Sequence, residues 1–278
     1  MYRLLLTSVV VLLPAYAQAQ EAQDKSRYHL FHPTPREQMR PLSADRPDIT
    51  ESPYTVDAGH FQIEMSFFDY THDDERGRRT ETWAFADTNL KVGLTNQMDI
   101  QFVFTAFGQE ASHGPGRDEV DRGLGDLTIR WKTNLWGNDS GAVALGVMPF
   151  ITIPTGTDLS VNELEGGLIV PLGIAVSEGI SIGLMGEVDV VYDEEDEGYD
   201  LQFVHTATCG FDIVDPLGGF VEYVGILSSD ADADYEAYFN TGLVYAVTDD
   251  LVFDTGVRIG LNRAAQDIGV FAGMTLRY

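Results

Sequence analysis

The sequence contains very little cysteine and is poor in basic residues. A single cysteine, Cys209, can form neither an intramolecular disulfide nor a cysteine-cluster metal site. Only 17 lysines and arginines stand against 44 aspartates and glutamates, so the formal net charge is -27 at pH 7. A chain with this charge repels phosphate backbones, and we therefore expect no nucleic-acid partner.

Long hydrophobic runs are also missing. The longest covers residues 4–13, well short of the roughly 20 residues that a membrane-spanning helix needs. It follows the basic Arg3 and precedes a small-x-small cleavage pattern in residues 15–20. This pattern predicts a secretory signal peptide over residues 1–19 rather than a short membrane anchor. Without a longer run, the mature chain could cross a membrane only as a closed barrel.

Motifs for catalysis and for metal binding are absent too. No Gly-x-Ser-x-Gly nucleophile motif occurs. His29 and His32 have no evident third ligand, which argues against a metal site there. Two acid-dense stretches, residues 193–197 and 230–236, lack the spacing of an EF-hand. We interpret them as solvated loops, with Ca²⁺ binding as the alternative, and we expect no enzymatic activity, no cofactor and no metal centre.

Residues 20–59 form a polar stretch that contains five prolines, at positions 33, 35, 41, 47 and 53. Proline at this density is incompatible with helix interiors and central strands. The stretch is therefore predicted to be extended or disordered at one end of the folded domain, or to enter the domain as a plug.

From residue 60 onward, polarity alternates with a period of two. The clearest case is residues 123–135, where Ile129 and Trp131 share one face and Arg130 and Lys132 share the other. A strand separates such residues cleanly, whereas a helix would scatter them around its circumference. The pattern predicts strands that have one face suited to lipid and one suited to water.

The connections between these strands alternate between short and long. Tight turns are expected near residues 95–97, 137–139, 178–179, 215–216 and 248–250. Longer polar loops are expected at 71–79, 109–122, 155–163, 193–198, 228–234 and 262–266. Short turns on one side and long loops on the other are typical of outer-membrane barrels, here with about twelve strands of roughly 10–14 residues. An even strand number places both ends of the barrel chain on the periplasmic side.

The last strand alternates up to an aromatic final residue, Tyr278. This ending resembles the C-terminal signal that the barrel assembly machinery recognises. The sequence thus predicts an all-β fold, an antiparallel up-and-down transmembrane β-barrel over residues 60–278. Its expected surroundings are the lipid and lipopolysaccharide of a bacterial outer membrane.

Several segments resemble one known family. They are residues 46–53, 59–64, 123–132, 149–156 and 165–172. The family consists of outer-membrane transporters labelled "MetA-pathway of phenol degradation", and the resemblance runs from about residue 46 to the C-terminus. It implies an outer-membrane barrel that transports small compounds, including hydrophobic or aromatic ones. It supplies no catalytic residues.

A barrel of about twelve strands is expected to have a narrow or partly plugged pore. Charges that line such a pore can contact solute or can pair with one another and brace the wall. Arg130, Lys132 and Arg258 are candidates for positive sites in an otherwise acidic lumen. A soluble periplasmic ligand-binding barrel and a structural barrel without transport are the alternatives. The predicted lumen-lining residues are Glu64, Asp87, Asn89, Lys91, Asp99, Asp126, Arg130, Lys132, Glu187, Asp189, Glu222, Asp254 and Arg258.

Overall fold

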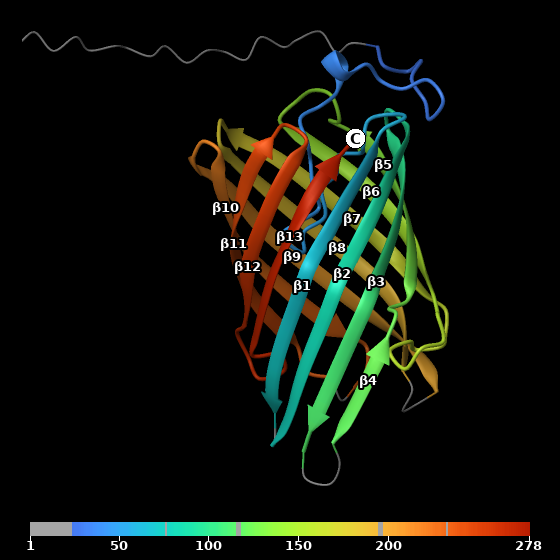
Figure 1. Cartoon of the computed structure of the whole chain (residues 1–278), viewed down its shortest axis with the longest axis vertical. Helices are drawn as coiled ribbons and strands as arrows, with labels where there is room; N and C mark the ends of the chain where they lie inside the picture. Colours follow the sequence, from blue (N-terminus) through green and yellow to red (C-terminus); the bar gives the residue numbers. More distant parts are fainter. Residues whose placement is uncertain (1–23, 76, 115–117, 194–196, 232) are drawn as a thin grey trace, which may run out of the picture.

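The computed structural model (Figure 1) describes residues 24–75, 77–114, 118–193, 197–231 and 233–278. The predicted signal peptide lies outside the described residues, as do Asp232 and residues 194–196 of the acidic stretches. No helix in the described part is long and apolar enough to cross a membrane. The elements are η1 (Arg36–Gln38), β1 (Phe61–Glu75), β2 (Arg78–Thr95), β3 (Met98–His113), β4 (Glu119–Gly123), β5 (Leu127–Trp136), β6 (Val143–Ile153), β7 (Glu165–Ser177), β8 (Ile180–Asp193), β9 (Gly198–Val214), β10 (Leu217–Ser228), β11 (Glu236–Thr248), β12 (Leu251–Gly260) and β13 (Ile268–Arg277).

The strands form one closed antiparallel barrel. β1 pairs with β2 and β2 with β3, each strand from β5 to β12 pairs with the next along the chain, and β13 pairs with β1 to close the sheet. β4 and β5 both pair with β3, β4 along its second half and β5 along its first half. They therefore share one position in the wall, and the barrel has twelve strand positions, as the sequence predicts. Among the described residues, the twelve long strands therefore pair on both sides, and the short β4 pairs with β3 alone.

The apolar faces of the strands point outward. Trp131 is 40% exposed, whereas its neighbour Lys132 is 1% exposed. On β1, likewise, Phe61 and Ile63 are exposed while Glu64 is buried. An apolar outer surface on a closed sheet suits a lipid environment. A soluble barrel would require the reverse arrangement, so this orientation excludes the alternative of a soluble periplasmic barrel.

Some strands are longer than the sequence analysis anticipates. β1, β2, β3 and β9 contain 15, 18, 16 and 17 residues. The expected loop over residues 71–79 is mostly strand, because β1 and β2 continue to pair through Asp74 opposite Arg79 and Glu75 opposite Arg78. Opposite charges directly across two strands stabilise such pairing in water. The polar composition therefore marks strand ends that extend beyond the apolar belt rather than a loop.

One group of inward-facing residues is apolar, contrary to the simple alternation. Met148, Ile169, Met185, Val204 and Val224, on β6 to β10, are all buried and pack together. We call these five residues the apolar cluster. They fill part of the lumen with hydrocarbon, much as a small protein core would be filled.

The two ends of the barrel differ. The end that carries the turns at 96–97, 178–179, 215–216 and 249–250 is the short-turn end, and the opposite end is the long-loop end. The C-terminus lies at the short-turn end, and residues 24–60 lie at this end and inside the barrel (Figure 1). We call residues 24–60 the N-terminal segment.

Candidate functional site

The N-terminal segment runs into the lumen without regular secondary structure other than η1. Its prolines prevent it from joining the sheet, so its backbone amides need other acceptors. Inward-facing carboxylates of the wall provide them. Glu64 accepts hydrogen bonds from the amides of Asp45 and Arg46, each at 3.1 Å.

Two further wall carboxylates bind the segment in the same way. Glu222 of β10 accepts hydrogen bonds from the amides of Ile49, at 3.0 and 3.1 Å, and of Thr50, at 2.8 Å. Asp99 of β3 accepts one from the amide of Val56, at 3.0 Å. All three carboxylates are at most 2% exposed. The wall therefore holds the segment at three depths through its main chain.

A buried ion cluster joins the middle of the segment to β2 and β5. Lys132 donates to both carboxylate oxygens of Asp45 at 2.8 Å, and Lys91 pairs with Asp45 and with Glu64. Both lysines are at most 2% exposed. Because charges removed from water are costly unless paired, this cluster depends on Asp45 remaining in place.

Arginines extend this charged contact toward the long-loop end. Arg46 of the segment donates to Asp254 at 2.6 and 3.1 Å and to Ser66 at 2.6 Å. Arg130 of β5 donates to Glu51 of the segment at 2.6 Å. Together with Glu64, Lys91 and Lys132, the residues Asp254 and Arg130 form what we call the charged patch of the wall.

Three more of the predicted lumen residues interact with the wall itself. Arg258 donates to Asp69 at 2.9 and 2.5 Å, Asp87 accepts from Thr105 at 3.0 Å, and Asn89 donates to Gln101 at 3.0 Å. These contacts brace the wall next to the segment.

The other three predicted lumen residues are Glu187, Asp189 and Asp126. Glu187 lines a cavity beside the segment, and Asp189 is buried with one carboxylate oxygen that lacks a hydrogen-bond partner within the described residues. Asp126 precedes β5 and accepts hydrogen bonds from Thr155 at 2.9 and 3.1 Å in the loop that follows β6. Asp126 therefore orders a loop at the long-loop end and does not contact the segment.

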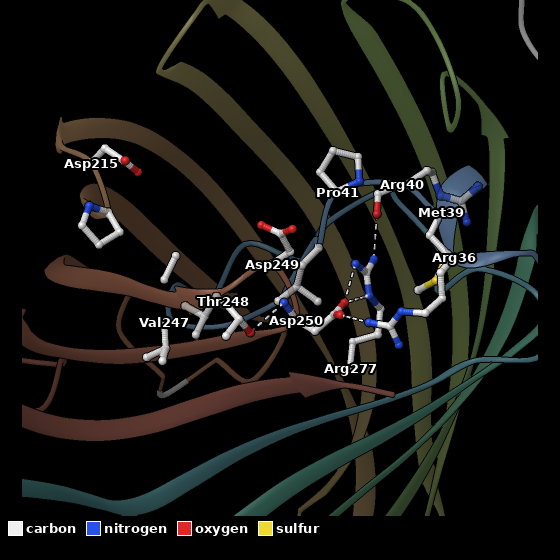
Figure 2. A pocket seen from close by; sticks show the side chains of 14 residues that line it. Arg36, Met39, Arg40, Pro41, Asp215, Val247, Thr248, Asp249, Asp250 and Arg277 are labelled. Atoms are coloured by element: carbon white, nitrogen blue, oxygen red, sulfur yellow. Dashed lines mark hydrogen bonds and ion pairs between the residues drawn. The ribbon is translucent and has the colours of Figure 1, made fainter.

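A second anchor holds the segment at the short-turn end (Figure 2). Arg36 pairs with Asp250 of the β11–β12 turn. Arg277 donates to Asp250 at 2.9 Å and to the carbonyl oxygen of Arg40 at 2.8 Å. Burial disfavours the charge of Asp250, but Arg277 and Arg36 outweigh this effect and hold the pKa of the carboxyl below its usual value.

Asp139 of the β5–β6 turn completes this anchor. It accepts hydrogen bonds from Lys25 at 2.7 Å and from Arg40 at 3.2 Å. Burial again opposes the charged form, but Lys25, Asn96 and Arg40 together lower the pKa of Asp139. The segment is thus fixed both at the mouth and at the centre of the barrel.

Cavities flank the segment. On its long-loop side lies a cavity of about 280 Å³ lined by Asp69, Asp87, Glu187 and Arg258, which we call the polar vestibule. Nearer the short-turn end lies another of about 280 Å³, against β7 to β11. Cavities of about 410 and 690 Å³ lie at the short-turn mouth, the larger lined by the residues drawn in Figure 2. The segment therefore narrows the lumen without filling it.

Sequence reasoning missed the residues of the segment that make these contacts, namely Asp45, Arg46 and Glu51. The segment has no periodicity from which a facing direction could be inferred. The available signal was the run of residues 46–53, where the family resemblance begins and where Arg46 and Glu51 both lie. In the described part of the chain, no group of three or more His, Cys, Asp or Glu side chains is arranged to hold a metal ion.

Comparison with known proteins agrees with this architecture. An outer-membrane channel from Pseudomonas putida F1 superimposes with a TM-score of 0.60 at 16% identity, covering 85% of this chain and 100% of the channel. The NanC porin gives a TM-score of 0.50 at 8% identity, covering 78% of this chain and 98% of the porin. Proteins of curated function include no match to this sequence.

At such identities these structures establish the fold alone. The sequence profile of one family, however, matches residues 44–278, from the middle of the N-terminal segment to the last residue. The chain therefore belongs to the family described as "Putative MetA-pathway of phenol degradation" and is a β-barrel of the bacterial outer membrane.

Proposed function

We propose that this barrel is a channel for passive passage of small solutes across the outer membrane, and that the N-terminal segment is its plug. The observation that carries the proposal is the filling of the lumen. Eight-stranded barrels are filled by their own side chains, and barrels of 16–18 strands are open. Here the centre is occupied by a separate stretch of chain with cavities on both sides.

The solutes that we propose are small and include hydrophobic or aromatic compounds. The description of the family, which refers to phenol degradation, supports this class. A passive channel requires no catalytic group or cofactor, and we assign none to this chain. The two proteins of known structure compared above are a channel and a porin.

We further propose two roles for the predicted lumen residues. Glu64, Lys91, Asp99, Lys132, Glu222 and Asp254 hold the plug, because each of them contacts it. Arg130, Arg258 and Glu187 line the polar vestibule and set the charge that a solute meets first.

For insertion into the membrane we propose that the terminal strand engages the barrel assembly machinery. Tyr278 is 83% exposed at the end of the chain. Its backbone amide donates to the carbonyl oxygen of Phe61 at 2.8 Å, at the seam between β1 and β13. Such a position leaves the Tyr278 ring accessible during closure.

Planar-bilayer recording tests the channel and the plug together. The mature chain should give a small conductance, and deletion of residues 24–57 should raise it several-fold, because the charged patch would then face open water. Deletion of residues 24–32 alone is the control, since it removes no contact with the charged patch. Absence of conductance in every form would contradict a channel, and equal conductance in every form would contradict a plug.

A further inference from the structure

Near its start, the N-terminal segment carries two apolar residues at the end of a tight hairpin. His29 and His32 exchange backbone hydrogen bonds, at 3.1 and 2.8 Å, and Leu30 and Phe31 lie between them. We call Leu30 and Phe31 the apolar tip. Phe31 is 88% exposed, more than any other large apolar side chain in the described part of the chain. The hairpin therefore holds an aromatic ring out of contact with most of the protein.

The hairpin is fixed in place on both of its sides. Before it, Tyr28 is buried, and its hydroxyl donates to Gln38 Oε1 at 3.0 Å. After it, the amide of Thr34 donates to the carbonyl oxygen of Ala58 at 2.9 Å, and His60 Nε2 lies 2.7 Å from the carbonyl oxygen of Thr34. Exposure of Phe31 is thus a property of an ordered structure and does not result from fraying of a chain end.

The base of the apolar tip is joined to the end of β2. The amide of Leu30 donates to the carbonyl oxygen of Leu94 at 2.9 Å. Leu94 lies two residues beyond Val92, which pairs with Phe61 of β1. Because a strand rises about 3.3 Å per residue, Leu94 is about 7 Å along β2 from the level of Phe61. The apolar tip therefore begins close to the level at which β1 begins.

This level is an edge of the lipid-facing surface. Phe61 is exposed on the outer face of β1, and Tyr278 is exposed beside it, joined to it by backbone hydrogen bonds of 2.8 and 3.1 Å. Outer-membrane barrels carry aromatic residues where the membrane meets water. Phe61 and Tyr278 therefore mark the membrane boundary at the short-turn end. In Figure 1 the first described residues, in dark blue, extend sideways past the ends of the neighbouring strands at this end.

We propose that the apolar tip inserts into the periplasmic leaflet of the outer membrane and attaches the start of the N-terminal segment to phospholipid. Lipid is the occupant because the tip lies at the edge of the apolar surface that the wall already presents to the membrane. Exposed Arg27, His29 and His32 flank the tip. Such polar side chains suit the headgroup layer, and an aromatic ring suits the layer beneath it. The inference depends on the outward apolar face of the wall and not on the proposed channel.

Spin labelling measures the depth of the tip. A nitroxide is attached to Phe31→Cys in a Cys209→Ser background, and the mature chain is reconstituted in vesicles of phosphatidylethanolamine and phosphatidylglycerol. Glu37→Cys, at an exposed position of η1, is the matched control. We expect collisions with oxygen to exceed those with a water-soluble nickel complex several-fold at position 31, because oxygen concentrates in lipid. The order should be reversed at position 37.

Hydrogen exchange tests whether the native ring stabilises the segment. In the same vesicles, Phe31→Ser should speed exchange of the amides of residues 28–32 about tenfold, because the burial of a phenylalanine side chain in an apolar layer is lost. Phe31→Leu keeps an apolar tip and is the matched control, with exchange close to that of the unchanged protein.

Other outcomes overturn the insertion. Preferential collision with nickel at position 31 would place the ring in water, and unchanged exchange in Phe31→Ser would show that the ring stabilises nothing. Protection of position 31 from nickel in isolated outer membranes, but not in vesicles of the purified protein, would mean that a second protein covers the tip instead of lipid.

Discussion

The charged patch and the apolar cluster line opposite regions of the same lumen and are built on different principles. On β1, β2, β5 and β12, charged side chains are buried because a separate stretch of chain supplies their partners. On β6 to β10, Met148, Ile169 and their neighbours are buried because they pack on one another. The first region depends on the N-terminal segment for its charge partners, whereas the second is held mainly by its own packing, with one added contact in which the Glu51 amide donates to Met185 Sδ at 3.4 Å. Burial in the lumen is therefore stabilised by different interactions in its two regions, by ion pairs in one and by apolar packing in the other.

The largest effect should come from neutralising Asp45, the carboxylate of the segment that Lys91 and Lys132 of the charged patch share. Among the described residues, Asp45→Asn leaves Lys132 with Glu51, at 3.9 Å, as its one ion partner. Breaking a buried ion pair in this way costs about 3–5 kcal/mol. Hydrogen exchange of the segment amides should report a fall of this size in the free energy of local opening. Asp249→Asn on the exposed turn is the matched control, and a fall below about 1 kcal/mol would show that the charged patch does not hold the segment.

A substitution in the apolar cluster should lower the free energy of unfolding of the barrel and should leave the docking of the segment unchanged. Met148→Ala creates a cavity among buried side chains and should lower the free energy of unfolding by about 2–5 kcal/mol. Equilibrium unfolding by urea in lipid vesicles measures this loss in the free energy of unfolding. Met274→Ala, at an outward-facing position of β13, should cost less because lipid chains can fill the space. Equal losses at the two positions would remove the distinction between a packed lumen and a lipid-facing surface.

The anchor at the short-turn mouth should contribute less than either region. Asp250→Asn weakens contacts to Arg36 and Arg277 that water partly screens, so the segment should lose about 1 kcal/mol or less of docking free energy. The same hydrogen-exchange measurement, restricted to residues 34–42, detects this change. A loss of docking free energy as large as that caused by Asp45→Asn would show instead that the main attachment of the segment lies at the short-turn mouth.

Lowering the pH from 7 to about 4.5 should produce the smallest change in the docking of the segment. The pKa values of Asp139 and Asp250 are lowered in the folded chain. Their contribution to docking is therefore fully present above the unfolded carboxyl pKa of about 3.9 and is lost as pH falls through the lower folded values. Protection of residues 24–42 should be constant from pH 7 to about pH 4.5 and should decline only below about pH 4. A decline between pH 7 and pH 5 would contradict this assignment.

The sequence predicts the wall far better than it predicts the contents of the lumen. At Trp131 and Lys132 the alternation fixes the facing direction, because a strand turns successive side chains to opposite sides. β6 and β7 are apolar on both faces, so no alternation distinguishes the inward Met148 and Ile169 from their lipid-facing neighbours. Asp45 and Arg46 lie in a stretch without periodicity, and their partners are up to 208 residues away along the chain. Such contacts are specified only by the closed barrel.

Gly59 and the seam at Phe61 have a consequence for how the pore would recover after opening. Gly59 adopts a φ of +76°, and a Cβ there would come within 2.8 Å of Pro33, so the chain reverses tightly from the lumen into β1. The N-terminal segment, which we propose to be the plug, is thereby tethered to the rim of the barrel. A tether of a few residues gives the segment an effective concentration at its docking site in the millimolar range. Redocking after opening would therefore be a unimolecular step that does not depend on protein abundance. Such a tethered segment would return to its docked position without an energy source or a second protein.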